Sequence, residues 1–240
     1  MEWGMILEAG LWGWLAASSL LLGAMIGMFA KLSRKVVASV MAYGSGVLIA
    51  AVCFEQLPDA LRLGGHLPTL VGMFCGGSLF VLASRWLDRL QGGGQGALVG
   101  LLIAAGAFLD GIPESLGLGL GLLDGGSVSL VMLVAIFLSN LPEGLASAAS
   151  LREEGRSKAW VFGLWAVIVL LSGLAAMAGP GLFTGLPDSW LAFVLGFSAG
   201  AVLCMLVDSM IPEAFAETHA LTGLITLSGF MTALALDKVL

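Results

Sequence analysis

Charge is scarce in this chain. Charged residues make up 11% of its 240 residues and hydrophobic residues 59%, whereas a soluble domain is about a quarter charged. This deficit excludes a soluble globular domain and predicts an all-α integral membrane protein embedded in a lipid bilayer. Because a membrane-crossing helix needs roughly 20 residues, the chain has room for about seven to nine of them and for no sizeable soluble domain.

Several functional motifs are also absent. No G-x-x-x-x-G-K-[ST] loop occurs, so transport driven by nucleotide hydrolysis within this chain is not expected. The Y-D and G-x-G-D settings of an intramembrane aspartyl protease are missing; no enzymatic activity, bound cofactor or nucleic-acid partner is predicted. Cys53, Cys75 and Cys204 stand singly in apolar runs without C-x-x-C spacing, which favours buried, inert thiols.

Apolar runs between charged or Gly/Pro breaks predict eight membrane-spanning helices in a single transporter domain, residues 1–240. The predicted spans are residues 5–30, 36–58, 68–88, 97–123, 128–151, 158–178, 189–215 and 221–240. The acidic start, Met1-Glu2, lacks the basic residues of a secretory signal, so the first run is expected to remain a span. Most tryptophans fall near predicted span ends, where amphipathic rings prefer to lie, and Trp165 is the exception.

The basic residues fall in alternate loops. Eight of the ten lie between spans one and two, three and four, or five and six; the other two are Arg62 and Lys238. Basic loops stay in the cytoplasm. The sequence therefore predicts cytoplasmic basic loops and both termini outside.

A proline followed by a carboxylate recurs four times, at Pro58-Asp59, Pro113-Glu114, Pro142-Glu143 and Pro212-Glu213. An offset of 154 superposes residues 46–60 of span two on residues 200–214 of span seven, and 110–115 of span four matches 139–144 of span five. The matched spans run in opposite directions under the predicted topology. We therefore expect inverted repeats in a 3+2+3 arrangement, a common transporter architecture.

The central pair of spans carries the chemistry. Asp110 and Glu114 lie four residues apart on one face of span four, and Ser139 and Glu143 do the same in span five beside Asn140. The proline of each motif frees a backbone carbonyl. Carboxylate, amide, hydroxyl and carbonyl oxygens are ligands for hard cations such as Mg²⁺, Mn²⁺ or Ca²⁺. In the alternative interpretation the prolines only kink the helices and the carboxyls stay protonated and hydrogen-bonded.

Further carboxylates lie along a possible ion pathway. Glu55 and Asp59 are near the predicted outer end of span two, and Asp208 and Glu213 are near the predicted inner end of span seven. They are candidates for entrance and exit stations of a cation. Simple solvation of helix ends explains their positions equally well.

These motifs resemble the ZIP family of divalent-metal transporters, whose fourth and fifth spans carry an H-N-x-P-E-G-like motif. The similarity is closest to the bacterial GufA-like branch, with its F-E-x-L-P-E-A and D-E-x-I-P-E-A signatures, because residues 54–60 read F-E-Q-L-P-D-A and residues 207–214 read V-D-S-M-I-P-E-A. The resemblance covers essentially the whole chain. It implies a multi-pass homodimer in the bacterial inner membrane that moves a cation such as zinc, manganese, iron or cadmium toward the cytoplasm by alternating access.

The chain departs from the family pattern at five positions. Asp110 and Gly111 replace the histidine and asparagine of the fourth span, and Ser139 opens the fifth-span motif. Ala176 stands where the sixth span usually has a glutamate, and Ser209 replaces a seventh-span glutamate. A single all-oxygen site is therefore expected in place of a two-metal centre. The alternative is a degenerate ZIP-like protein with lost or altered transport, acting as a metal sensor or as a carrier of another solute.

Overall fold

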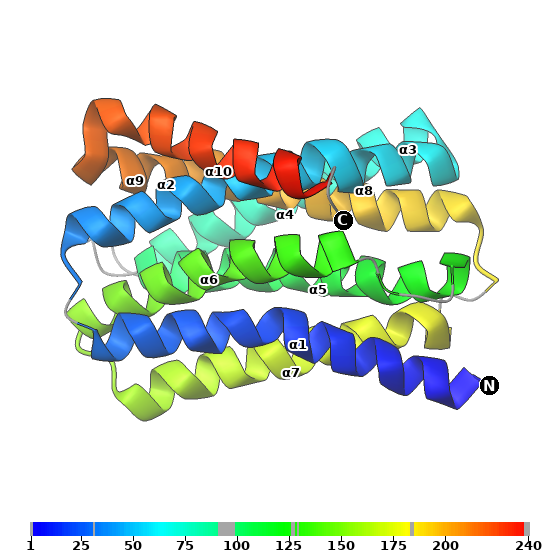
Figure 1. The fold of residues 1–240 in the computed structure, drawn as a ribbon, viewed down its shortest axis with the longest axis horizontal. Coiled ribbons are helices and arrows are strands. Elements are labelled where there is room, and N and C mark those ends of the chain that lie inside the picture. The colour runs from blue at the N-terminus through cyan, green and yellow to red at the C-terminus, as the bar shows by residue number, and fades with distance from the viewer. Residues whose placement is uncertain are drawn as a thin grey trace.

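All regular elements are helical in the part of the chain that the computed structural model describes, which comprises residues 2–30, 32–90, 99–125, 128, 130–182 and 185–237. This confirms the all-α class (Figure 1). The elements are α1 (Glu2–Phe29), α2 (Arg34–Ala51), η1 (Val52–Gln56), α3 (Leu57–Gly64), α4 (His66–Leu90), α5 (Val99–Gly125), α6 (Leu130–Glu153), α7 (Lys158–Leu182), α8 (Asp188–Met205), η2 (Leu206–Met210), α9 (Ile211–Thr218), η3 (His219–Leu221) and α10 (Thr222–Asp237).

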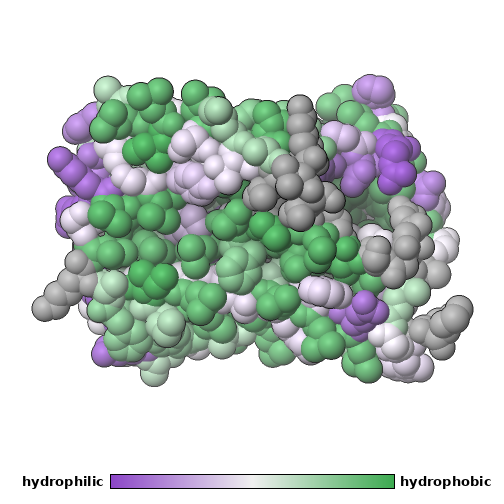
Figure 2. Space-filling view, viewed as in Figure 1, coloured by the Kyte–Doolittle hydropathy of each residue, from purple (hydrophilic) through white to green (hydrophobic). Residues whose placement is uncertain are grey.

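The long helices lie side by side along the long axis of the molecule, and the α1–α2, α6–α7 and α9–α10 connections are at the same end (Figure 1). Hydrophobic residues cover the middle of the bundle in the view of Figure 2, and hydrophilic residues gather toward its two ends. Large apolar side chains such as Leu67 and Phe74 of α4 are exposed on the bundle surface. This distribution suits a bilayer whose hydrocarbon core is about 30 Å thick.

Six helices in the described residues are long and apolar enough to cross a membrane, which makes the chain a multi-pass membrane protein. They are Trp3–Phe29, Arg34–Gly64, His66–Trp86, Gly100–Leu122, Lys158–Leu182 and Asp188–Ala235. The last is a 48-residue run that contains both predicted spans 189–215 and 221–240. The predicted span 128–151, which forms α6 with its buried polar residues, is not one of the six. The count of eight stays a prediction.

Two helices continue past their prolines. The predicted spans 36–58 and 189–215 stop near Pro58 and Pro212, but the helices run on to Gly64 and Thr218. A π-helical turn, η1 or η2, precedes each proline and leaves it in the first turn of α3 or α9. In the π-helical turns, Leu57 donates its N–H to the carbonyl of Val52 and Ile211 donates to Leu206, five residues back, so the helix continues into a proline that has no N–H.

The two interrupted helices have identical element lengths. Adding 154 to the bounds of α2 (34–51), η1 (52–56) and α3 (57–64) gives the bounds of α8 (188–205), η2 (206–210) and α9 (211–218). The turns that follow also correspond, since Gly65 and the residue 154 positions later, His219, both have positive φ, 77° and 45°. His219 is the only non-glycine residue with positive φ among the described residues.

Paired glycines bring the helices together. A Cβ at Gly46 of α2 would meet the backbone of Thr226 in α10, and one at Gly200 of α8, again 154 residues later, would meet the backbone of Met73 in α4. The reverse contacts are made by Gly229 on α2 and Gly76 on α8. Small residues permit such close approach of backbones in membrane helices. The α2–α10 and α4–α8 contacts are therefore built in the same way.

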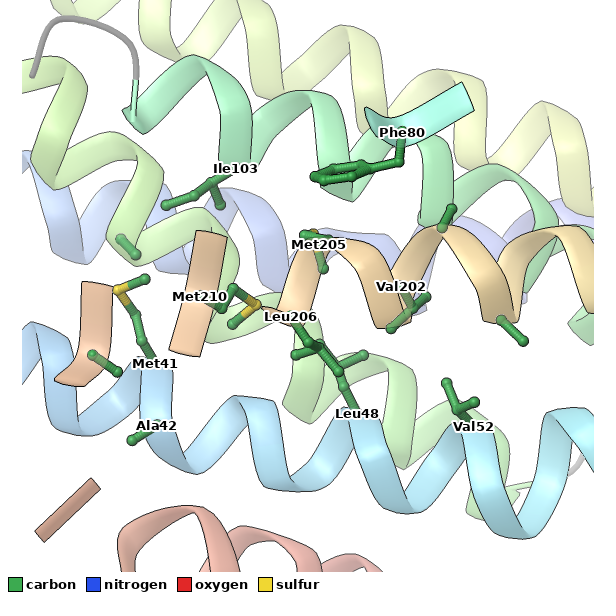
Figure 3. Close-up of a cluster of buried hydrophobic side chains, with 14 residues drawn as sticks. Met41, Ala42, Leu48, Val52, Phe80, Ile103, Val202, Met205, Leu206 and Met210 are labelled. Atoms are coloured by element: carbon green, nitrogen blue, oxygen red, sulfur yellow. The ribbon is translucent and has the colours of Figure 1, made fainter. Parts of the chain in front are cut away.

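A hydrophobic cluster fills the space between these units. Figure 3 shows Met41, Leu48 and Val52 on one side, Val202, Met205, Leu206 and Met210 facing them, and Ile103 and Phe80 nearby. All are buried. The cluster thus joins α2 and α8 with α4 and α5.

The expectation of buried cysteines is wrong for two of the three. Cys53 and Cys75 are exposed on the bundle surface, and Cys204 is half-buried. An apolar run indicates burial in a soluble protein, but a membrane helix also presents apolar side chains to lipid. The sequence pattern could not distinguish the two environments.

Candidate functional site

Polar side chains are buried in the middle of the bundle on α5 and α6, which pack against each other. Glu114 is 5% exposed, Asn140 3% and Glu143 0%. Each motif lies half-way along its helix, since the midpoints of α5 and α6 are residues 112 and 141.5. A carboxyl group away from water at this depth is costly and marks a functional site by default.

The α6 motif surrounds a proline inside the helix, Pro142. Because proline has no N–H, the carbonyl of Leu138 lacks its usual helical partner. The hydroxyl of Ser139 donates to the carbonyl of Ile136 at 3.0 Å, so its lone pairs remain available as acceptors. The ring of Pro142 packs against Gly44 of α2, where a Cβ would lie 2.7 Å from the proline Cγ. The motif is thus held directly against α2.

The α5 motif is described only in part. Asp110 lies in α5 one turn before Glu114, but its side chain and that of Pro113 are outside the described side chains. The predicted pairing of Asp110 with Glu114 therefore stays a prediction. In the described part of the chain, no three His, Cys, Asp or Glu side chains are grouped closely enough to hold a metal ion. The site would therefore need Asp110 or the neutral oxygens of Ser139 and Asn140.

The structure adds a polar group on α7 that the sequence analysis did not identify. Ser172 is buried, and a Cβ at Gly111 of α5 would lie 3.3 Å from its hydroxyl oxygen. Ala176, one turn further along α7, is fully buried, and a Cβ at Gly13 of α1 would lie 2.5 Å from its methyl carbon. The side chain at 176 is therefore directed at α1. A glutamate introduced there would meet that helix.

The sequence analysis also did not identify a buried polar pair formed by Gln56 and Ser198. Gln56 of η1 donates from Nε2 to the hydroxyl of Ser198 in α8 at 2.7 Å, and both residues are buried. Gln56 lies beside Glu55 and two residues before Pro58, inside the predicted span 36–58. An amide within a predicted span is the signal that could have identified it.

The four predicted pathway residues lie on two segments, η1–α3 and η2–α9. Glu55 is half-buried in η1, and Asp59 is exposed and 3.7 Å from Arg62. On the other segment, Asp208 is exposed in η2 and Glu213 of α9 is partly buried. Only Glu213 lines a cavity that the structure describes.

That cavity is a vestibule of about 890 Å³ at the end where the α1–α2 and α6–α7 connections meet. Its charged lining comprises Arg34, Arg152, Arg156, Glu153, Glu154, Glu213 and Glu217. Arg34 and Glu153 form an ion pair at 3.1 Å, and Arg152 donates to the carbonyl of Ala30 at 2.9 Å. The start of α2, the end of α6 and α9 all contribute to its lining.

At the opposite end, α3 packs closely on α8. A Cβ at Gly64 of α3 would lie 2.5 Å from the methyl carbon of Ala192 and 2.8 Å from the Cα of Ser189, both in α8. The position 154 residues after Gly64 is Thr218, at the end of α9 beside the vestibule. The matching helices α9 and α2 also pack against each other, and the vestibule lies beside this contact.

Glu154 provides a pH test of the vestibule. Burial raises the pKa of this carboxyl above its ordinary value of 4.5, with the backbone N–H of Gly100 and the charge of Arg156 opposing. The folded state thus binds the proton more tightly, so this group's contribution to stability is complete below pH 4.5 and is lost as pH rises. We expect Glu154→Gln to raise the thermal unfolding midpoint at pH 7 relative to the wild type.

The same variant should behave like the wild type near pH 4, where the carboxyl is protonated in both states. Unfolding midpoints of the purified protein at both pH values measure the difference. A midpoint gap that is equal at pH 4 and pH 7 would contradict the assignment.

Comparison of the chain with protein-family models finds no match, and comparison with curated proteins finds none either.

Proposed function

We propose that this protein is a divalent-cation transporter similar to the ZIP family, which moves a cation such as zinc, manganese, iron, cadmium or magnesium toward the cytoplasm of a bacterium. The observation that carries the proposal is the burial of Glu114 and Glu143 half-way along two adjacent helices. Carboxyls at this depth mark a functional site by default, and a bound cation would stabilise their charged form. The surrounding oxygens of Ser139, Asn140 and Asp110 complete an all-oxygen ligand set that suits hard cations.

The fold supports an inverted-repeat transporter. We propose that α1–α4 and α7–α10 form two inverted triplets around the central pair α5 and α6, giving eight spans in a 3+2+3 arrangement. The identical lengths of α2–η1–α3 and α8–η2–α9, and the matched glycine contacts at Gly46 and Gly200, are what two copies of one unit would produce. Repeats of this type place the substrate site near the bilayer midplane.

The difference between the two ends supports alternating access. In an inverted-repeat transporter, the two halves adopt unequal conformations, and exchanging them opens the opposite side. Here the described residues form a vestibule beside the α2–α9 contact, whereas Gly64 brings α3 and α8 into close contact at the other end. We therefore assign this conformation to the state that releases the cation on the vestibule side. Glu213 lies on that release route, and we place Glu55 and Asp59 on the route from the opposite side.

The orientation follows from the basic residues. Eight of ten lie in alternate loops, and the vestibule contains three of their arginines, so we place the vestibule in the cytoplasm and both termini outside. In a cysteine-free background, Ser33→Cys and Ser157→Cys should react only with a label added on the cytoplasmic side. His66→Cys and Leu186→Cys should react only from outside.

Labelling of intact cells and of inverted membrane vesicles with an impermeant maleimide distinguishes these sides. The reverse pattern would invert the orientation and turn the release route into an entrance.

Uptake by proteoliposomes across a panel of Zn²⁺, Mn²⁺, Fe²⁺, Cd²⁺ and Mg²⁺ tests the function itself. We expect uptake of at least one cation that saturates with concentration. The ZIP resemblance also implies a homodimer, which cross-linking in the membrane would detect. If no cation enters, the transport proposal is refuted.

One observation favours a second candidate, a metal sensor derived from such a transporter. Ala176 is packed against Gly13, so α7 offers only Ser172 where the family would have a glutamate at 176. A sensor would bind a cation with the same carboxylates but would not move it. Binding by calorimetry without uptake would select this candidate.

A further inference from the structure

The hydrogen bond between Gln56 and Ser198 has no counterpart in the second repeat unit. The position 154 residues after Gln56 is Met210, and the position 154 residues before Ser198 is Gly44. All four residues are buried. In that half the matching positions hold a methionine and a glycine, and Gly44 packs on the ring of Pro142.

The pair lies level with the α5 motif. Met205 of α8 packs on Gly106 of α5, where a Cβ would meet its sulfur. Ser198 is seven residues, or two turns, from Met205 and therefore on the same face of α8. Helices α5 and α8 are antiparallel. The start of α5 lies toward the vestibule, because Ser147 of α6 donates to the carbonyl of Gly100, and the end of α8 lies there too, because α8 leads into α9. Seven residues beyond Gly106 is Pro113.

The amide of Gln56 is hydrogen-bonded through its nitrogen. Its Nε2 donates to Ser198 at 2.7 Å, whereas Oε1 is buried and accepts no hydrogen bond from the described residues. Gln56 as a whole is 6% exposed. Buried polar atoms in native structures usually have a partner, and an exception calls for an explanation such as an ion. Amide oxygens are established ligands of hard divalent cations.

We propose that Gln56 supplies a neutral oxygen ligand to a divalent cation at the level of the Pro113–Glu114 turn, and that Ser198 orients it. The pair then helps to set the preference for hard over soft cations. This inference rests on the transport function proposed above. It adds to the candidate site a residue from η1, outside the central pair of helices.

Gln56→Met gives the sharpest test, because the matching position of the other half already holds a buried methionine. The change keeps the length of the side chain and replaces an amide oxygen by a softer thioether sulfur. We expect KM for Mn²⁺ uptake to rise by about tenfold, KM for Cd²⁺ to change by less than about threefold, and kcat to stay similar for both. Ser198→Ala should shift the Mn²⁺/Cd²⁺ preference in the same direction by a smaller factor.

Two further variants complete the test in proteoliposomes. Gln56→Glu keeps the oxygen and adds charge, so KM for Mn²⁺ should fall, which makes the inference testable even if the methionine variant does not fold. Ser19→Ala is the matched control, because Ser19 is also a buried serine but donates only within its own helix, to Ala16 at 3.0 Å. It should leave both KM values unchanged.

The outcomes separate this inference from the proposed function. If the wild type takes up cations but Gln56→Met leaves the Mn²⁺/Cd²⁺ ratio of kcat/KM unchanged, or lowers uptake of both equally, Gln56 is not a ligand and the transport function stands. If the wild type takes up neither cation nor any other of the panel, both are overturned.

Discussion

Glu143→Gln is expected to weaken divalent-cation binding by at least tenfold, about 1.4 kcal/mol, and to abolish uptake. Glu143 is completely buried, and the substitution conserves its volume while removing the charge that attracts the cation. Glu114→Gln should have a similar effect, because both carboxylates act on one ion in the proposed site. The double variant should lose little more than either single one, since groups that act together are not additive. Calorimetric titration and proteoliposome uptake measure both quantities.

The two glutamine substitutions weaken cation binding but should not lower the thermal stability of the cation-free protein. A buried carboxylate is costly in the absence of its cation, so the glutamine variants should unfold at the same or a higher temperature than the cation-free wild type. Glu8→Gln is the matched control, because Glu8 is exposed and accepts a hydrogen bond from Trp12 at 3.4 Å. It should bind and transport like the wild type. Unaltered uptake in both buried variants would exclude the proposed site and favour protonated carboxyls that serve only packing.

Gly46→Ala and Gly200→Ala should each destabilise the protein by about 1–3 kcal/mol, because overpacking a close contact displaces the backbones. At both positions the new methyl group would meet a backbone on the neighbouring helix, at Thr226 or Met73. If the two units are copies, the two losses should be similar. Unfolding in detergent by heat or denaturant, with the yield of monodisperse protein, measures them.

Gly163→Ala is the control for helix propensity. Gly163 lies in α7, and a Cβ there would meet no atom within 4 Å. Alanine at such a position is expected to be neutral or to stabilise by about 0.5–1 kcal/mol, because it restricts the unfolded chain. Equal effects of Gly46→Ala and Gly163→Ala would contradict the close α2–α10 contact.

The repeat could be predicted in outline but not in detail. The offset of 154 follows from the Pro58 and Pro212 motifs, and α2–η1–α3 and α8–η2–α9 have bounds with the same offset. The π-helical turns before the prolines were not predicted. Periodicity and composition indicate that a helix is present. Whether one of its turns is α-helical or π-helical depends on how the neighbouring helices pack against it.

The sequence by itself determined the environment and predicted the chemistry of the site. Few charges and long apolar runs specify a membrane protein because lipid accepts only satisfied backbones and apolar surfaces, and the proline-carboxylate motifs specify buried oxygens on α5 and α6. Only the tertiary structure decided that Cys53 faces outward, that Ala176 is directed at α1, and that Gln56 meets Ser198 across 142 residues. In a membrane helix both the lipid-facing and the buried faces are apolar, so the pattern along one helix cannot show which face meets a partner.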